Sequence, residues 1–182
     1  MKILYLLLIV ATNIVTAAIE PLSIAGGALI VPAGSLFAGA VFVLRDLVQL
    51  KHGKSTAYTL ILLATILSAG MSIAQGDVAH IAFASSAAFF LSESADTEIF
   101  SRVQKPLYTR IALSGIIGGL LDSTVFVVLG LSPIGTGALP WGTVPSAVAG
   151  QILVKTCVQM IAAACLLLNT IHKRRPSARH ER

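Results

Sequence analysis

The sequence predicts an all-α integral membrane protein with six transmembrane helices, and three observations lead to this prediction. Hydrophobic residues make up 55% of the 182-residue chain and charged residues only 12%, with a mean hydropathy of +0.86. Average soluble domains carry about 25% charged residues, so a soluble enzyme, a disordered chain and a free nucleic-acid-binding domain are excluded. Six apolar stretches have about the length that crosses a bilayer. Lys and Arg occupy alternate connections between them.

Each apolar stretch ends at a proline, a glycine or a charged residue, which gives its boundaries. The first stretch also resembles a signal peptide, but Asn13 interrupts its apolar region, so we expect it to remain as a span. We expect one membrane domain over residues 1–172 and a basic tail over residues 173–182. The expected spans cover residues 2–19, 33–50, 55–74, 78–101, 107–130 and 144–172.

The positive charges predict the orientation of the spans. Lys51 and Lys54 follow the second span, Arg102 and Lys105 follow the fourth, and five of the 13 basic residues lie in the last ten. The connections after the first, third and fifth spans contain no Lys or Arg. Because basic loops stay in the cytoplasm, both termini are expected on the cytoplasmic side. The protein is expected to be a multi-pass protein of the cell's inner (plasma) membrane. The basic tail is expected to contact anionic lipid rather than nucleic acid.

The first outer connection, residues 20–34, is apolar but contains Gly26, Gly27 and two prolines. It is therefore a poor helix, and we expect a strand-like or partly re-entrant segment that covers a cavity. Cys157 and Cys165 lie in the sixth span without disulfide or metal-site spacing, so they are expected to be core thiols.

Four polar residues are predicted to lie near the bilayer midplane: Asn13, Glu93, Asp122 and Lys155. At the helical rise of about 1.5 Å per residue, Asn13, Glu93 and Lys155 lie about 13–16 Å from an end of their spans, and Asp122 lies about 18 Å from Arg110. Ionisable groups at that depth cost about 2.5–3.5 kcal/mol each on insertion scales, so they are candidate functional residues. Four spans thus converge on one level.

At helical spacing, further polar and aromatic residues lie on the same helix faces as these four residues. Phe89, Glu93 and Asp96 share one face of the fourth span, and Gln151 lies one turn before Lys155 on the sixth. The buried charged residues have two alternative explanations: they neutralise one another in ion pairs, or they bind a ligand. Lys155 is expected to pair with Asp122 or Glu93, and Arg45 with Asp96, whereas Arg45-Asp46 as a unit is expected in a helix-end or loop contact. The interior acids outnumber Lys155, so at least one acid needs a proton or another donor.

The sequence contains no arrangement typical of catalysis. The four histidines lie at span ends or in the tail, and no His/Cys/Glu cluster or phosphate-binding loop occurs. We therefore expect a protein that is not an enzyme, has no cofactor and does not itself hydrolyse ATP.

Short motifs in a fixed order resemble the VUT (vitamin uptake transporter-like) family of queuosine precursor transporters. Asn13, Asp46, Asp96, Asp122, Phe126 and Lys155 match positions of that family, while Glu93 replaces a Gln found in some members. The motifs are Thr12-Asn13, the segment from Gly34 to Asp46 with Gly53 after it, the segment from Glu93 to Phe100, Ser114, the segment from Asp122 to Phe126, and Lys155.

The resemblance implies uptake of a 7-deazaguanine, typically 7-cyano-7-deazaguanine, for tRNA modification. It also implies likeness to the six-helix substrate-binding subunits of energy-coupling-factor transporters, which bind ligand under the first outer loop. The alternative is such a subunit for another vitamin-like molecule, working with a separate ATPase module. Energising partner subunits and a homo-oligomer both remain open.

The chemistry of a deazaguanine fits the polar residues. A carboxylate can accept the ring N–H and the exocyclic NH2 group together, and we expect Glu93 in that role. Asp122 or Asn13 would accept remaining donors, and Lys155 or Gln151 would donate to the ring carbonyl. Phe89 or Phe126 would stack on the ring, an interaction of about 1–3 kcal/mol by analogy with base stacking.

Overall fold

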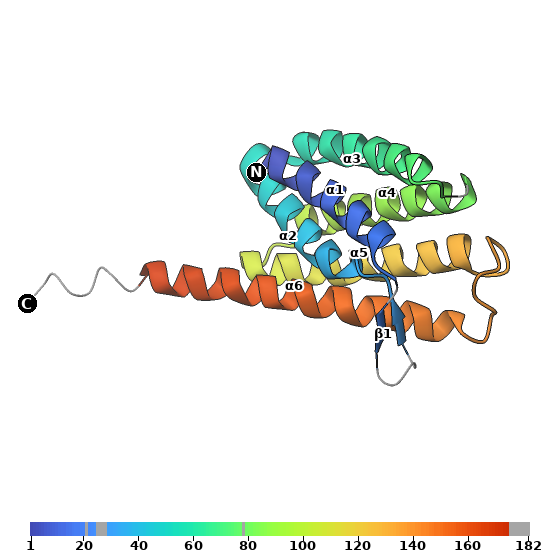
Figure 1. The fold of residues 1–182 in the computed structure, drawn as a ribbon. Helices are drawn as coiled ribbons and strands as arrows, with labels where there is room; N and C mark the ends of the chain where they lie inside the picture. Colours follow the sequence, from blue (N-terminus) through green and yellow to red (C-terminus); the bar gives the residue numbers. More distant parts are fainter. Residues whose placement is uncertain (21, 25–28, 78, 175–182) are drawn as a thin grey trace, which may run out of the picture.

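The computed structural model describes residues 1–20, 22–24, 29–77 and 79–174. Six helices are found near the expected boundaries. They run antiparallel to their neighbours in sequence, and both the N-terminus and the end of the last helix lie at the same end of the bundle (Figure 1). The helices are α1 (Lys2–Ala18), α2 (Ser35–His52), α3 (Lys54–Ala74), α4 (Ala79–Arg102), α5 (Leu107–Phe126, extended by a π-helical turn over Val127–Leu131) and α6 (Val144–Arg174).

Three of the described helices are long and apolar enough to cross a membrane by length and composition alone. They are α3, α5 with its π-helical turn, and the part of α6 over Val144–Cys165. Helix α1 is apolar but has only 17 residues, and α2 and α4 carry the interior charges. The protein is thus a helical membrane protein, as predicted.

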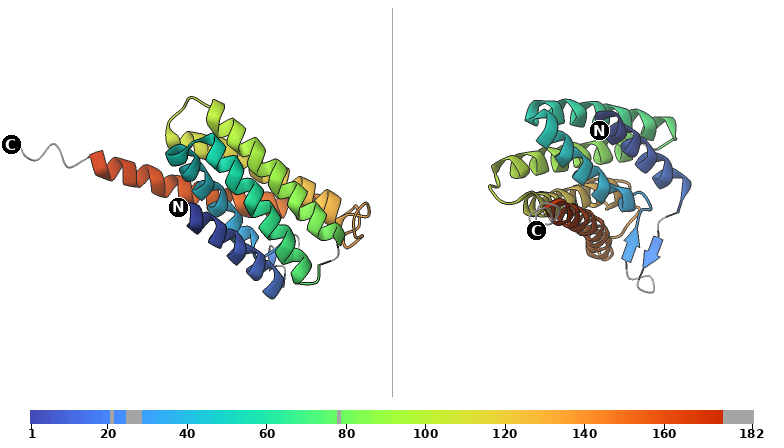
Figure 2. Two further views of the ribbon diagram at one scale, coloured as in Figure 1. Left: turned by 90° about the horizontal axis from the view of Figure 1, so that it is seen from above. Right: turned by 90° about the vertical axis from the view of Figure 1, so that its left-hand side faces the viewer.

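The connection between α1 and α2, which the sequence predicts to be an outer loop, is strand-like, one of the two expected forms. Leu22–Ile24 (β1) pairs antiparallel with Leu29–Val31 (β2), so the fold is all-α apart from this short hairpin. Strand β2 packs against α6, and the hairpin projects beside that helix (Figures 1 and 2). Residues 22–24 and 29–31 therefore pair with each other instead of extending a helix.

Helix α2 occupies the centre of the bundle and contacts the five other helices (Figure 2). Its face toward α6 has no side chain at Gly39, where an added Cβ would lie 2.8 Å from Cβ of Val158 and 2.9 Å from the carbonyl oxygen of Lys155. The glycine thus allows α2 and α6 to approach closely next to Lys155. The backbone position of that lysine depends on this contact.

Helix α6 differs from the sequence predictions in the exposure of its cysteines and in where it ends. Cys157 and Cys165 are free and exposed on α6, so the prediction of core thiols is wrong. In a membrane protein the outward helix face meets lipid, so an apolar cysteine need not be in the core. The expected basic tail begins inside α6, which continues to Arg174, and residues 175–182 lie outside the described residues.

Candidate functional site

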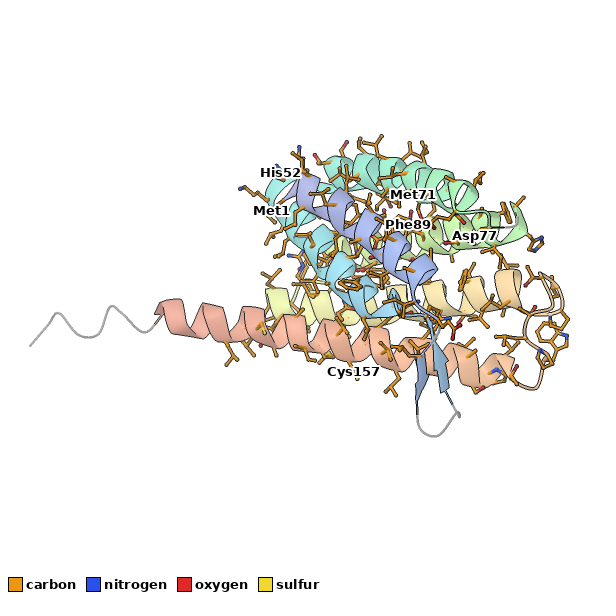
Figure 3. The ribbon with its side chains drawn as sticks, viewed as in Figure 1. Met1, His52, Met71, Asp77, Phe89 and Cys157 are labelled. Atoms are coloured by element: carbon orange, nitrogen blue, oxygen red, sulfur yellow. The ribbon has the colours of Figure 1, made fainter. Side chains whose placement is uncertain are left out.

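A cavity of about 250 Å³ lies inside the bundle, lined by side chains from all six helices. Its rim is at the bundle end where α1 and α3 finish and includes Ala17, Gln75 and Asp77, which are exposed. Figure 3 shows Asp77 at this end, Phe89 midway along the bundle, and Met1 and His52 at the opposite end. The cavity therefore runs from one end of the bundle to its middle.

Seven of the eight residues predicted as a binding site line this one cavity. They come from four helices and from positions up to 142 residues apart, so the structure brings these distant residues together in one cavity. The seven are Asn13, Phe89, Glu93, Asp122, Phe126, Gln151 and Lys155. The eighth, Asp96, does not line the cavity and lies in the ion cluster beneath it.

Lys155 pairs with Asp122, the first of the two partners expected for it. Nζ of Lys155 lies 2.5 Å from Oδ2 of Asp122 and also donates to Oγ of Ser123 and Oε1 of Gln151, each at 3.1 Å. An ammonium group has three protons, so these three acceptors use its full capacity. The Lys155 side chain is 4% exposed and that of Asp122 is 19% exposed. The acid is therefore the more accessible member of the pair.

A second cluster lies below the cavity around Arg45. Its guanidinium group forms ion pairs with Asp46 at 3.1 Å, with Glu93 at 3.3 Å and with Asp96. The expected pair with Asp96 is confirmed. The expectation that Arg45-Asp46 makes a helix-end or loop contact is wrong, because both residues are fully buried. Helix α2 is central, so a position in its C-terminal half still faces other helices.

Glu93 connects the cavity with this cluster. Its Oε2 atom accepts a hydrogen bond from the Tyr5 hydroxyl at 3.3 Å and faces Nε of Arg45, whereas Oε1 has no donor among the described residues. The Glu93 side chain is only 1% exposed. A buried carboxylate oxygen without a donor is unfavourable. The floor of the cavity thus has an unused acceptor.

Asn13 has a structural contact as well as a place in the cavity wall. Its Nδ2 donates to the carbonyl oxygen of Ile9 at 2.9 Å, and its Oδ1 accepts from Oγ of Ser68 on α3 at 3.1 Å. The amide therefore joins α1 to α3. Phe89 and Phe126 are half-buried in the wall and offer aromatic surface.

The glycines of α5 make room for neighbouring side chains. A Cβ at Gly118 would lie 3.1 Å from Cβ of Asp96, and one at Gly115 would overlap the amide of Gln159. These two glycines therefore allow close packing of α5 against its neighbours.

Several contributors were missed from the sequence. Tyr5 lies in an uninterrupted apolar run, and Ser68 is a small polar residue of a kind common in spans, so neither position stands out. Thr12, Ser72 and Gln75 also line the cavity. In this region of α1, the sequence marked Asn13 by its depth and Thr12 only by the resemblance of Thr12-Asn13 to a known motif.

Comparison with known proteins gives one match. A family model described as "Putative vitamin uptake transporter" (Vut_1) matches residues 69–168, more than half of the chain, from the end of α3 to most of α6. The comparisons with curated proteins and with solved structures found no significant match. The family describes transporters, which agrees with a membrane setting and a small-molecule substrate. By this match, which includes Glu93, Asp122 and Lys155, the chain belongs to the vitamin uptake transporter (VUT) family.

Proposed function

We propose that this protein is a six-span transporter of the cell's inner (plasma) membrane that imports a queuosine precursor, 7-cyano-7-deazaguanine or a related 7-deazaguanine, for tRNA modification. The observation that carries the proposal is a cavity in which acids, an amide, a lysine and two phenylalanines meet. Family membership supports uptake, and the ordered motifs favour this substrate class. The protein acts as a carrier and not as an enzyme.

The orientation of the cavity fits import. Its rim lies at the bundle end whose connections contain no Lys or Arg, whereas Lys51, Lys54, Arg102 and Lys105 lie at the other end. If basic connections are cytoplasmic, both termini are inside and the cavity opens outward. In this arrangement residues 1–172 form the membrane domain. Helices α2 and α4 cross because their interior charges are paired with one another.

The polar groups can recognise a deazaguanine as follows. The ring N–H and exocyclic NH2 edge faces Glu93 at the cavity floor, with Asp122 beside it as the more accessible acid. For the ligand to reach Oε1 of Glu93, the side chains around Glu93 at the bottom of the cavity must move slightly apart. Lys155 has no free proton, so the NH2 group of Gln151 is the better donor to the ring carbonyl.

The walls suit a compact planar ligand. Phe89 and Phe126 offer stacking surface, and Ile9, Val41 and Ala88 add apolar contacts. Small-molecule pockets are about 300–1,000 Å³, so a cavity of about 250 Å³ is small on that scale. A bicyclic base fits this description better than a vitamin with a long tail.

Uptake of labelled 7-cyano-7-deazaguanine into proteoliposomes tests the proposal. The purified chain alone should take up the precursor, and excess unlabelled precursor should compete. Uptake only after addition of an ATPase module and its partner would favour the alternative, a substrate-binding subunit of a vitamin transporter. Uptake by neither preparation, together with no binding, would contradict both.

A further inference from the structure

We propose that the Arg45 cluster is a proton-binding site that couples substrate import to proton entry, an inference that rests on the proposed transport function. The cluster consists of Arg45, Asp46, Glu93 and Asp96, all fully buried. Three carboxylates share one guanidinium group, so full ionisation would leave three negative charges against one positive charge in a dry interior. Such an excess is strongly unfavourable, and the cluster therefore holds at least one proton.

The neighbouring helices do not supply the missing positive charge. Lys155 on α6 is committed to Asp122 on α5, which leaves that pair neutral. Tyr5 on α1 donates one neutral hydrogen bond, and Ser114 on α5 donates another to Asp46 at 3.3 Å. Helix α3 packs the apolar residues Leu60 and Ala64 against Tyr5 and α2. The surplus of acids is therefore local, with Arg45 as its only cation among the described residues.

Unpartnered atoms show where a proton can sit. Oε1 of Glu93 and Oδ1 of Asp96 are buried without a hydrogen-bond donor or an ion-pair partner among the described residues. A metal cation is disfavoured there, because Arg45 already occupies the centre of the cluster. A proton needs no such space. Its binding converts a carboxylate into a neutral carboxyl group.

The cluster has polar continuations on both sides. On the cavity side Glu93 is a lining residue, so a proton from the outer water can reach it. On the inner side Arg45 donates to Oγ1 of Thr97, and Gln49 donates to the Thr97 carbonyl oxygen at 3.1 Å and to Oγ of Ser101 at 2.7 Å. Ser101 is exposed near the inner end of α4. These groups mark the side on which the proton leaves when the bundle opens inward.

The coupling step is a simple proton transfer. The carboxylate takes a proton from outer water, and the same proton is released to inner water after the substrate has moved. No bond of the substrate changes and nothing is oxidised. Each cycle carries one substrate molecule and one positive charge inward.

The closing experiment uses proteoliposomes in which a potassium ionophore clamps the membrane potential at zero. One proton per substrate makes an inward gradient of one pH unit equivalent to about tenfold accumulation of 7-cyano-7-deazaguanine. The wild-type chain should approach this accumulation. Asp96→Asn should retain gradient-free exchange but lose pH-driven accumulation, because Asp96 does not line the cavity. Glu98→Gln, on the same helix but in an exposed pair with Lys54, is the matched control and should behave as wild type.

Infrared difference spectroscopy provides a readout that needs no substrate. The wild-type chain should show the C=O band of a buried protonated carboxyl group, and the band should shift or weaken in Asp96→Asn and Glu93→Gln but not in Glu98→Gln. Absence of any such band at neutral pH would overturn the proton site. Normal exchange with accumulation that ignores the pH gradient would overturn the coupling. If the carboxyl band is present but the precursor does not bind, the result would instead contradict the proposed substrate.

Discussion

Lys155 on α6 and Asp122 on α5 form a short ion pair, with 2.5 Å between Nζ and Oδ2, in the wall of the cavity. Ser123 and Gln151 complete the hydrogen bonding of the ammonium group. The pair thus joins two helices and at the same time holds an acid at the surface where a ligand would lie. The Lys155–Asp122 ion pair therefore has a structural role and a place in the cavity wall.

Replacing Lys155 by Met should destabilise the protein, because Asp122 is left without its cation. Breaking a buried pair costs about 3–5 kcal/mol. Thermal unfolding of the purified chain should occur at a clearly lower temperature, and uptake should fall with it. Lys54→Met, which breaks an exposed pair with Glu98, should leave the unfolding temperature unchanged. Unchanged stability of Lys155→Met with weaker binding would instead make Lys155 a direct ligand contact.

Replacing Gly39 by Ala should also disturb the site. The new Cβ would meet Val158 and the carbonyl of Lys155 within 2.9 Å, and overpacking of this kind costs about 1–3 kcal/mol. Gly70→Ala on α3 is the matched control, since nothing lies within 4 Å of its Cβ position. It should keep or raise the unfolding temperature, because Ala favours helix over Gly. Equal effects of the two substitutions would argue against a close approach of α2 and α6.

Labelling should show that Gly76 and Asp77 face outward. The background is a Cys157→Ser/Cys165→Ser chain, because both natural cysteines are exposed on α6. A cysteine placed at Asp77 should react with an impermeant maleimide on intact cells, and one at Lys51 should react only after the membrane is opened. The reverse pattern would invert the proposed orientation and close the cavity to the outside.

Glu93→Gln tests recognition of the amine edge. The substitution keeps the size of the side chain but replaces one acceptor oxygen by an NH2 group, which then faces a ligand donor. The loss should be about 1–3 kcal/mol, or roughly tenfold to a hundredfold in affinity. The binding constants of the precursor and of an analogue without the exocyclic amine should differ strongly in wild type and much less in the variant. An unchanged preference would move this role to Asp122.

The sequence predicted the helices and the meeting of distant polar residues for a clear reason. Apolar length and the positions of Lys and Arg are local properties, and the helical rise converts them into depth. Depth alone placed Asn13, Glu93, Asp122 and Lys155 at one level, where the cavity is found. The binding roles of these residues stay predictions.

The sequence did not predict how the charges are distributed among partners. The rotation of a helix about its axis decides whether a side chain faces the cavity or another helix. That rotation depends on how the helix packs against the other five helices. Asp96 shares a face with Glu93 but lies one turn deeper, where Arg45 reaches it. Arg45 was assigned to a helix end because the central position of α2 is a property of the whole bundle.

Equilibrium binding to the purified, detergent-solubilised chain is the most direct test of the central claim. Saturable binding of 7-cyano-7-deazaguanine is expected, with guanine weaker by about tenfold or more, the scale on which a small substituent discriminates ligands. Val41→Trp, which places a bulky side chain in the cavity wall, should abolish the binding. Failure to bind the precursor, or equal affinity for the precursor and guanine, would contradict the account.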